Sequence, residues 1–326
     1  MKAIQIKEFG GPEVLKLVEI PEPMPETQEV RIRVHAAGVN PNEAYARTGT
    51  YGAYIPELPY TPGFDGAGII DLVGEGVTKF QPGDRVYIGG FMAKRNTGTY
   101  AEKVVVDVTC VHPLSDELTF EQGASLGIPG LAAYQAIVLR GQVKESDTVL
   151  IHGGSGAVGL TAIQIAKAIG AKVVATSSTE EGRKLILALG ADAAIAHVQK
   201  DAYDEIMAAT DGQGPDVIIE MLANQNLETD LDIARKAGRI VILGSRGTIQ
   251  IDPRHTMTKG LTILGMSAIN LDTAETVEAY AALTKLVDEG EILPLVGDVM
   301  ALAEAADAHE RILTKKGNGK LVLKLI

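Results

Sequence analysis

One stretch of sequence decides the fold, and it reads Thr148-Val149-Leu150-Ile151-His152-Gly153-Gly154-Ser155-Gly156-Ala157-Val158-Gly159. Its first part is an apolar run typical of a buried strand, and its second part carries the spacing G-x-G-x-x-G. Residues 156–169 then place Leu160, Ile163 and Ile169 on one helical face. The glycine spacing alone is a weak signal, but a strand before it and a helix after it are the context that dinucleotide binding requires.

The glycines of this loop have separate physical roles. Gly154 is predicted to permit the tight turn, Gly156 to let the backbone approach a pyrophosphate, and Gly159 to let helix and strand pack closely. The helix that follows offers free N–H groups and the positive end of its dipole to phosphates. The predicted cofactor loop therefore comprises Gly154, Ser155, Gly156, Ala157, Val158 and Gly159.

Short apolar runs continue to alternate with helical stretches on both sides of this loop. Continuous apolar strands separated by helices indicate a parallel sheet that is covered on both faces. Six such strands predict a doubly wound α/β fold. The expected strands are Thr148 to His152, Lys172 to Thr176, Ala193 to Ala196, Asp216 to Met221, Arg239 to Leu243 and Thr262 to Met266.

The chain before about residue 121 has a different character. It is rich in turn signals, and residues 30–35 alternate apolar and polar side chains, as a half-buried strand does. Beyond the six strands, residues 274–289 and 302–313 are predicted amphipathic helices. The last strand, 320–325, is expected to rejoin the N-terminal domain. The predicted domains are residues 1–122, a β-rich domain, 123–267, the dinucleotide-binding domain, and 268–326, a segment that returns to the first.

Composition narrows the function classes. The formal net charge of −12 argues against a nucleic-acid binder, which usually carries a basic excess. No apolar run approaches the roughly 18 residues of a membrane helix, and no secretory signal is evident, so a cytoplasmic location is expected. The single cysteine, Cys110, stands in what resembles a buried strand. We interpret it as a core residue, with a nucleophilic role as the alternative.

The end of the second strand discriminates between NAD and NADP. NAD enzymes place Asp or Glu there to accept hydrogen bonds from the ribose. Here the strand 172–176 is followed by Ser177-Ser178-Thr179, without a carboxylate. NADPH is therefore favoured, and the hydroxyl groups of Ser177 and Ser178 are predicted contacts.

The helix that follows carries both acids and bases. Ser178-Thr179-Glu180-Glu181 matches a capping box, so the two acids are interpreted as first-turn residues. Arg183 and Lys184 come within one turn and are placed to face a 2′-phosphate, or else they form a solvated helix surface. Two later strand ends, 220–226 and 243–247, should face the same crevice, and Arg246 is a candidate basic contact or a structural ion-pair partner.

Beyond these patterns, the chain resembles the quinone oxidoreductases of the zeta-crystallin type, zinc-free members of the medium-chain dehydrogenase/reductase superfamily. The resemblance covers nearly the whole chain. Its most telling stretches are Glu8 to Leu15, Gly38 to Tyr45, Glu220 to Asn224 and Gly244 to Ile249. Ala157 departs from the pattern, because the family usually has a second glycine there.

The resemblance implies a GroES-like, β-rich catalytic domain beside a Rossmann domain. Carried over position by position, it also implies a set of NADPH contacts. The contacts not already introduced are Tyr45, His197, Asn226, Leu243, Gly244, Ser245, Arg246, Met266, Ser267 and Ala268. At Ser178 the family has a glycine, so the backbone contact transfers better than the side chain.

Zinc separates the branches of this superfamily. Alcohol dehydrogenase-like members bind catalytic zinc through Cys and His. This chain has Asn40 where that Cys would stand, and Phe64-Asp65 where a His-Glu pair would stand. A single cysteine also cannot supply a structural four-cysteine site. No metal site is predicted.

The activity implied is NADPH-dependent reduction of quinones, by hydride or one-electron transfer. Asn40 and Tyr45 are predicted to line the substrate side of the nicotinamide, with Tyr51 nearby. One alternative is an NADPH-dependent reductase of activated C=C bonds. Another is a non-enzymatic structural or RNA-binding role, against which the net charge argues. The resemblance implies a homodimer or homotetramer, for which the strand near residues 261–266 is a candidate edge.

Overall fold

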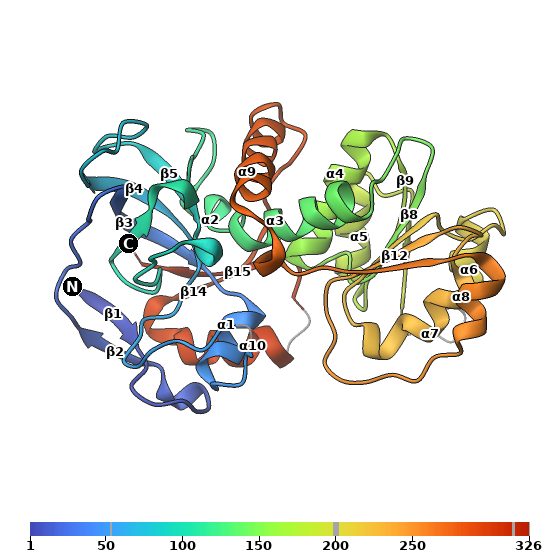
Figure 1. Cartoon of the computed structure of the whole chain (residues 1–326), viewed down its shortest axis with the longest axis horizontal. Coiled ribbons are helices and arrows are strands. Elements are labelled where there is room, and N and C mark those ends of the chain that lie inside the picture. The colour runs from blue at the N-terminus through green and yellow to red at the C-terminus, as the bar shows by residue number, and fades with distance from the viewer. Residues whose placement is uncertain (53, 198–201, 315–316, 326) are drawn as a thin grey trace. The chain divides into compact units, whose positions relative to one another are not determined.

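The computed structural model describes residues 1–52, 54–197, 202–314 and 317–325 (Figure 1). The chain divides into two compact units. Unit 1 contains Met1–Pro129, Thr273–Asp288 and Pro294–Ile326, and unit 2 contains Gly130–Asp272 and Glu289–Leu293. Among the described residues, none of the helices combines the length and the apolar content needed to cross a membrane.

Unit 2 is built on a six-stranded parallel sheet in the order β10-β9-β8-β11-β12-β13. This order is that of a doubly wound nucleotide-binding sheet, so the predicted fold class is confirmed. The sheet's core residues include Leu150, Val174, Ile218 and Ile240, one from each central strand. Its strands are β8 (Thr148–Ile151), β9 (Lys172–Thr176), β10 (Ala193–Ile195), β11 (Val217–Glu220), β12 (Arg239–Ile242) and β13 (Thr262–Gly265).

Helices alternate with these strands, and α4 (Ala157–Ile169) lies where the apolar spacing predicted a helix over residues 156–169. Because the strands are parallel, the segments that follow β8, β9, β11 and β12 emerge at one edge of the sheet. That edge is where the candidate site is built. The helical elements are α3 (Gly127–Tyr134), η4 (Gln135–Arg140), α4 (Ala157–Ile169), α5 (Glu180–Ala188), α6 (Ala202–Ala209), α7 (Ala223–Ile233), α8 (Pro253–Lys259) and η5 (Ala268–Asn270).

Unit 1 is built on a seven-stranded sheet in which β14-β15-β3-β4-β5-β7 follow one another and β6 pairs with β3. β1 (Lys2–Gln5) and β2 (Lys16–Glu19) form a separate pair. The sheet's strands are β3 (Glu29–Gly38), β4 (Asp65–Val73), β5 (Arg85–Gly89), β6 (Lys103–Asp107), β7 (Val111–Pro113), β14 (Val296–Ala301) and β15 (Lys320–Lys324). Its helical elements are η1 (Pro12–Val14), α1 (Pro41–Arg47), η2 (Gly90–Met92), η3 (Val108–Cys110), α2 (Phe120–Gly123), α9 (Thr273–Asp288), η6 (Leu302–Glu304) and α10 (Ala305–Thr314).

The strand expected over residues 30–35 is longer and more deeply buried than alternation predicts. It is β3, in which Arg31 is buried although its position in the pattern is polar. The reason is a bidentate contact, since the Arg31 guanidinium donates to both carboxylate oxygens of Asp71 at 2.9 and 3.0 Å. A paired and hydrogen-bonded charge tolerates burial that an unpaired one does not.

The C-terminal strand lies in the sheet of unit 1. β15 pairs antiparallel with β3, and Val322 lies opposite Gly38. The units divide at 129/130 and 272/273, a few residues beyond the expected 122/123 and 267/268. Residues 289–293 join unit 2, where the Leu293 backbone exchanges hydrogen bonds of 2.7 and 3.2 Å with the Gln164 side chain.

Cys110 is a core residue, as interpreted, but it does not lie in a strand. β6 ends at Asp107, and residues 108–110 form the turn η3. The Asp107 side chain accepts a hydrogen bond from the Thr109 N–H at 2.9 Å, which stabilises the turn and ends the strand. Burial raises the pKa of the Cys110 thiol to about 11, so the thiolate needed for nucleophilic attack is disfavoured.

Candidate functional site

The glycine loop between β8 and α4 forms the predicted turn, but the structural roles of Gly153 and Gly154 differ from the prediction. The left-handed residue is Gly153, with a φ of 60°, and not Gly154. Gly154 donates its N–H to the Thr176 carbonyl at 2.7 Å, and a Cβ there would lie 2.9 Å from the Cβ of Ala175. Gly154 is therefore required for close packing against β9, and Gly153 for the turn.

The start of α4 fits a phosphate group. The helix begins at Ala157 after the N-cap Gly156, and no side chain caps it, so the N–H groups of its first turn have no intrahelical acceptor. A Cβ on Gly156 would meet only the Gly153 carbonyl oxygen, at 3.5 Å. The backbone at Gly156 is thus open to the close approach of a ligand. The backbone at Gly154 and at Gly159 is not, because neighbouring atoms crowd those positions.

Two buried serines connect this loop to the next strand. The Oγ atoms of Ser155 and Ser177 lie 3.0 Å apart, and both residues are buried. The Ser177 hydroxyl, a predicted cofactor contact, is therefore hydrogen-bonded within the protein and orients the loop. Ser178, the next residue, is half-buried.

The helix α5 begins one residue later than the capping-box prediction. Its N-cap is Thr179, whose side chain accepts a hydrogen bond from the Gly182 N–H at 3.0 Å. Lys184 pairs with Glu180 one turn earlier at 2.7 Å. The Arg183 side chain, by contrast, makes no hydrogen bond or ion pair with any residue that the structure describes. Of the two basic candidates, Arg183 is the one free to meet an added phosphate.

A hydrogen bond to Asn224 joins the segments that follow β11 and β12. Asn224 accepts a hydrogen bond from the Arg246 N–H at 2.8 Å, and Ser245 donates to the Gly247 carbonyl at 2.9 Å. These contacts fix the exposed loop that carries Arg246. Asn226 is directed inward, since its amide donates to both carboxylate oxygens of Glu220 at 3.2 Å.

The remaining predicted contacts of unit 2 follow β10, β12 and β13. His197 is exposed after β10, and Leu243 and Gly244 are half-buried after β12. Met266 donates its N–H to the Ile242 carbonyl at 3.0 Å, which extends the β12–β13 ladder by one bond. Ser267 and Ala268 come next and are half-buried. These positions are the carboxyl-terminal ends of parallel strands, where ligands of such sheets bind.

A buried ionisable cluster lies directly behind the glycine loop, and sequence reasoning missed it. His152 Nε2 lies 2.8 Å from Asp230 Oδ1 and 3.6 Å from Glu220 Oε2. Both carboxylate side chains are fully buried. The signal available in the sequence was a histidine and a glutamate at the ends of two otherwise apolar strands. Their ligand atoms lie within 4.8 Å of one another, but hydrogen bonds within the protein occupy them.

The cluster holds protons more tightly than its separate groups would. Burial and the neighbouring Asp230 carboxylate raise the pKa of Glu220 to about 7, against the opposing effect of His152. Burial lowers the pKa of His152, but the Asp230 carboxylate outweighs it and the net direction is upward. The cluster therefore keeps protons in the folded state at pH values where the unfolded chain has released them.

The replacement Glu220→Gln should flatten the pH dependence of stability. A raised pKa of Glu220 stabilises the folded state fully below pH 4.5, and this contribution is lost as pH rises towards 7. The raised pKa of His152 acts in the same direction. We expect wild-type stability to fall relative to Glu220→Gln by on the order of 2–3 kcal/mol between pH 5 and 8. Urea unfolding across that range measures the difference.

Buried histidines elsewhere titrate in the opposite sense, so only the difference between proteins is informative. Burial lowers the pKa of His112 and of His309 to about 3, which removes stability as pH falls below 6.5. These groups are common to both proteins and cancel in the comparison. Parallel stability curves for wild type and Glu220→Gln would show that the cluster does not titrate in this range.

Unit 1 contains a second buried network. It includes Asn40 and Asp65, two of the positions at which the sequence differs from the zinc-binding branch of the superfamily. Lys320 lies 2.8 Å from Asp65 Oδ2 and also donates to the Asn40 side-chain oxygen. The Asn40 amide donates to Asp65 at 2.9 Å and to Glu43 at 3.2 Å. Asn40 is therefore buried with its polar atoms engaged by the protein, and the Lys320 ammonium supplies the positive charge among these carboxylates.

Glu43 extends the network to the helix α1 and to the core. It accepts from the Asn40 and Phe64 N–H groups at 2.9 Å each, and from the Tyr100 hydroxyl at 2.8 Å. Burial raises the pKa of Glu43, an effect that Lys320 opposes. The network fixes the start of α1, the helix that carries Tyr45.

Tyr45 and Tyr51 come together, as expected. Their ring centroids are 6.4 Å apart, and both rings are half-buried. The Tyr45 hydroxyl makes no hydrogen bond to the described residues, and burial raises the pKa of Tyr51. A phenol hydroxyl that is not bonded within the described part of the protein is suited to donate to a carbonyl oxygen.

Comparisons with known proteins support both halves of this description. Residues 26–116 match the family model "Alcohol dehydrogenase GroES-like domain", and residues 157–286 match "Zinc-binding dehydrogenase". The human quinone oxidoreductase is 44% identical over 100% of this chain and 98% of its own. A solved Escherichia coli quinone oxidoreductase complexed with NADPH is 28% identical with a TM-score of 0.88, covering 99% of this chain and 100% of that one. A solved NAD-dependent alcohol dehydrogenase is 31% identical with a TM-score of 0.91, and each chain is fully covered.

The fold and the two family matches define a medium-chain dehydrogenase/reductase with a GroES-like part and a Rossmann part. Within that class, the chain belongs to the quinone oxidoreductase family.

Proposed function

We propose that this protein catalyses the NADPH-dependent reduction of quinones. The observation that carries the proposal is the glycine loop. It combines an open backbone at Gly156 with a following strand end that has serines where NAD enzymes have a carboxylate. The identity of 44% with a quinone oxidoreductase over the full chain supports the choice of substrate. A quinone is an electron-poor acceptor and needs no metal to polarise it.

The chain's own residues would bind and orient the cofactor, which when bound supplies the reducing equivalents. The first-turn N–H groups of α4 would hold the pyrophosphate, with Ser155 fixed by Ser177. Arg183 would face the 2′-phosphate. His197, Asn226, the run Leu243 to Arg246 and the run Met266 to Ala268 remain predicted contacts at the strand ends.

Steady-state kinetics test this proposal directly. Oxidation of NADPH and of NADH is followed with 1,4-naphthoquinone and with an α,β-unsaturated ketone. We expect turnover with NADPH and the quinone to exceed the other three combinations by at least tenfold in kcat/KM. Preference for the enone would favour a C=C reductase, and absence of turnover with any acceptor would favour a non-enzymatic role.

Arg183→Ala should weaken the binding of NADPH and leave that of NADH unchanged. The Arg183 side chain has no partner among the described residues, so its guanidinium is available for a charge-assisted contact with the 2′-phosphate. Such a contact contributes about 1.5–3 kcal/mol, which is a tenfold or greater rise in Kd. Titration of the cofactor's fluorescence measures it.

Lys184→Ala is the matched control for Arg183→Ala. The two residues are neighbours on α5, but Lys184 pairs with Glu180. It should change the NADPH Kd by less than about twofold, because exposed ion pairs contribute little. Equal effects of the two substitutions would indicate a general electrostatic attraction and would overturn the specific role of Arg183.

Tyr45→Phe should lower kcat/KM for quinones about tenfold, because it removes one hydrogen bond of about 1.4 kcal/mol. The ring contact with Tyr51 is retained in this variant. Unchanged turnover together with unchanged NADPH affinity would exclude the proposed role of Tyr45. Asn40 is better placed as a positioning residue, because its side chain already bonds Asp65, Glu43 and Lys320.

Assembly and location belong to the proposal as well. β13 is an edge strand with an exposed Ile263, so it can pair with a second copy in a homodimer or homotetramer. Light scattering after size-exclusion chromatography measures the mass. A cytoplasmic location stays a prediction.

A further inference from the structure

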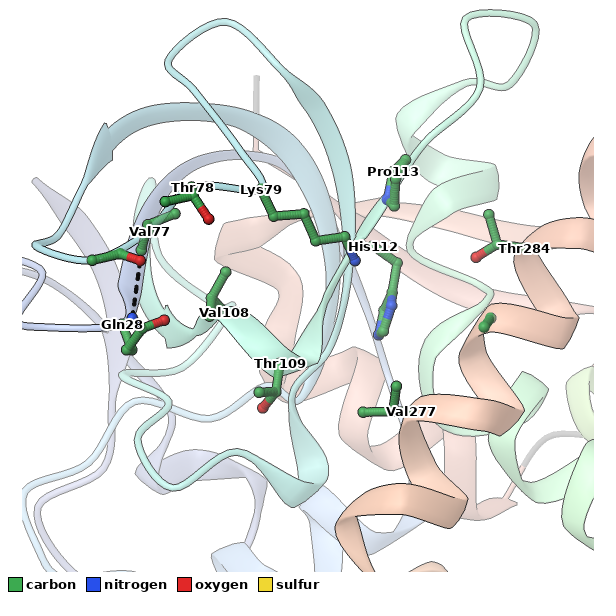
Figure 2. A pocket seen from close by; sticks show the side chains of 12 residues that line it. Gln28, Val77, Thr78, Lys79, Val108, Thr109, His112, Pro113, Val277 and Thr284 are labelled. Atoms are coloured by element: carbon green, nitrogen blue, oxygen red, sulfur yellow. Dashed lines mark hydrogen bonds between the residues drawn. The ribbon is translucent and has the colours of Figure 1, made fainter.

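A pocket in unit 1 lies apart from every residue assigned to cofactor or substrate. It has a volume of about 480 Å³ and is formed by the loop before β5, by η3 and β7, and by the helix α9. Figure 2 shows its side chains converging from these elements. This volume lies within the range of about 300–1,000 Å³ that is typical of small-molecule sites.

The walls of the pocket are largely apolar. Val77 and Val108 lie on one side, and Val277 of α9 lies on the other (Figure 2). Val277 is 47% exposed. These side chains would bury apolar surface against an occupant, at about 25 cal/mol per Å² removed from water.

His112 forms part of the pocket wall. The residue is only 7% exposed, and its Nε2 atom is buried without a hydrogen-bond partner among the described residues. Its ring packs against both Tyr87 and Tyr280, at centroid distances of 5.0 and 4.2 Å. Burial and the nearby Lys79 lower the pKa of His112 to about 3, so the ring is neutral at physiological pH. His112 therefore adds an uncharged aromatic surface to the wall.

Lys79 is the group that points to a ligand. Among the described residues that line the pocket it alone is charged, in a chain whose net charge is −12. Its side chain runs across the pocket towards His112 (Figure 2). The ammonium makes no ion pair with any described residue and lies 5.1 Å from the centroid of the Phe80 ring. An unpaired cation beside apolar walls is complementary to an anion that carries an apolar body.

We propose that this pocket binds a small apolar carboxylate, whose carboxylate pairs with Lys79 and whose apolar body packs against Val77, Val108 and Val277. The site is independent of the proposed reduction, because none of its residues is assigned to that reaction.

Binding of decanoate to the full-length protein tests the proposal. Isothermal titration should show saturable binding at one site per chain. 1-Decanol, which has the same apolar body without the charge, should bind at least tenfold more weakly, and acetate should not bind measurably. Equal binding of decanol would overturn the assignment of an anion site, and absence of saturable decanoate binding would overturn the site itself.

Two substitutions locate the binding. Lys79→Met keeps the apolar stem and should weaken decanoate binding at least tenfold, while Lys94→Met, at another exposed lysine, should leave it unchanged. The imidazole resonances of His112, a wall residue of the pocket, should shift on addition of decanoate to the wild-type protein. Unchanged affinity in Lys79→Met, or unshifted resonances, would overturn the proposal. Quinone turnover should be the same in Lys79→Met as in wild type.

Discussion

Replacing Lys320 with methionine should destabilise the protein by about 3–5 kcal/mol, because it removes one partner of a buried ion pair. Lys320 is 2% exposed and its ammonium lies 2.8 Å from a fully buried Asp65 carboxylate. The methionine has a similar volume, so the loss is electrostatic rather than one of packing. Asp65 would be left as a buried charge with only amide donors, and Glu43 would lose the cation that opposes its burial. Urea unfolding measures the change.

Lys324→Met is the matched control, because Lys324 lies on the same strand with its side chain 57% exposed. It should change stability by less than about 0.5 kcal/mol. The double variant Lys320→Met/Asp65→Asn should recover part of the loss, since it removes the uncompensated charge. Breaking a buried ion pair costs at least ~3 kcal/mol. If the unfolding free energy of Lys320→Met lies within about 1 kcal/mol of the wild-type value, the network is solvated and the proposed burial effect is excluded.

Gly159→Ala should disable the glycine loop. A Cβ at Gly159 would lie 2.6 Å from the Gly153 carbonyl oxygen and 2.7 Å from the Gly154 Cα, and neither backbone atom can move without deforming the turn. We expect a loss of about 1–3 kcal/mol in stability. The NADPH Kd should rise about tenfold to a hundredfold, because the displaced loop no longer presents its N–H groups correctly. Fluorescence titration and thermal unfolding measure the two effects.

Gly156→Ala separates the ligand from the fold. Its Cβ would lie 3.5 Å from one carbonyl oxygen and meet nothing closer, so the folded protein accepts it. Stability should be unchanged while NADPH binding weakens, because the methyl group occupies the space that a pyrophosphate approaches. Gly265→Ala, which has open space around it, should change neither property. If Gly156→Ala binds NADPH with wild-type affinity, the pyrophosphate does not approach the chain at Gly156.

The local patterns that predicted the fold were those in which short-range physics dominates. Apolar runs separated by helical stretches specified each strand of unit 2, and the strand–glycine–helix order specified the binding edge. The observed ends of two elements differ from the predicted ends, because at each end a side chain accepts a hydrogen bond from a backbone N–H group. Thr179 instead of Ser178 caps α5, and Asp107 ends the strand before Cys110.

The assignment of roles within the site needed more than pattern. Gly153, and not Gly154, adopts the left-handed conformation, which depends on how the loop meets β9. Ser177 proved to be buried against Ser155, and Lys184 to be paired, which singles out Arg183. These contacts depend on how the segments pack in space. They cannot be predicted from the residue types alone, because the same residue types fit either assignment of roles.

The sequence by itself determined each strand of the parallel sheet, the dinucleotide loop and the absence of a carboxylate after β9, because each of these features lies within one short segment. Only the tertiary structure decided which charged groups share a buried environment. Asn40 and Lys320 are 280 positions apart yet hydrogen-bonded, as are His152 and Asp230 across 78 positions. Coulombic and desolvation energies depend on distance in space and on burial, and neither is a property of position along the chain.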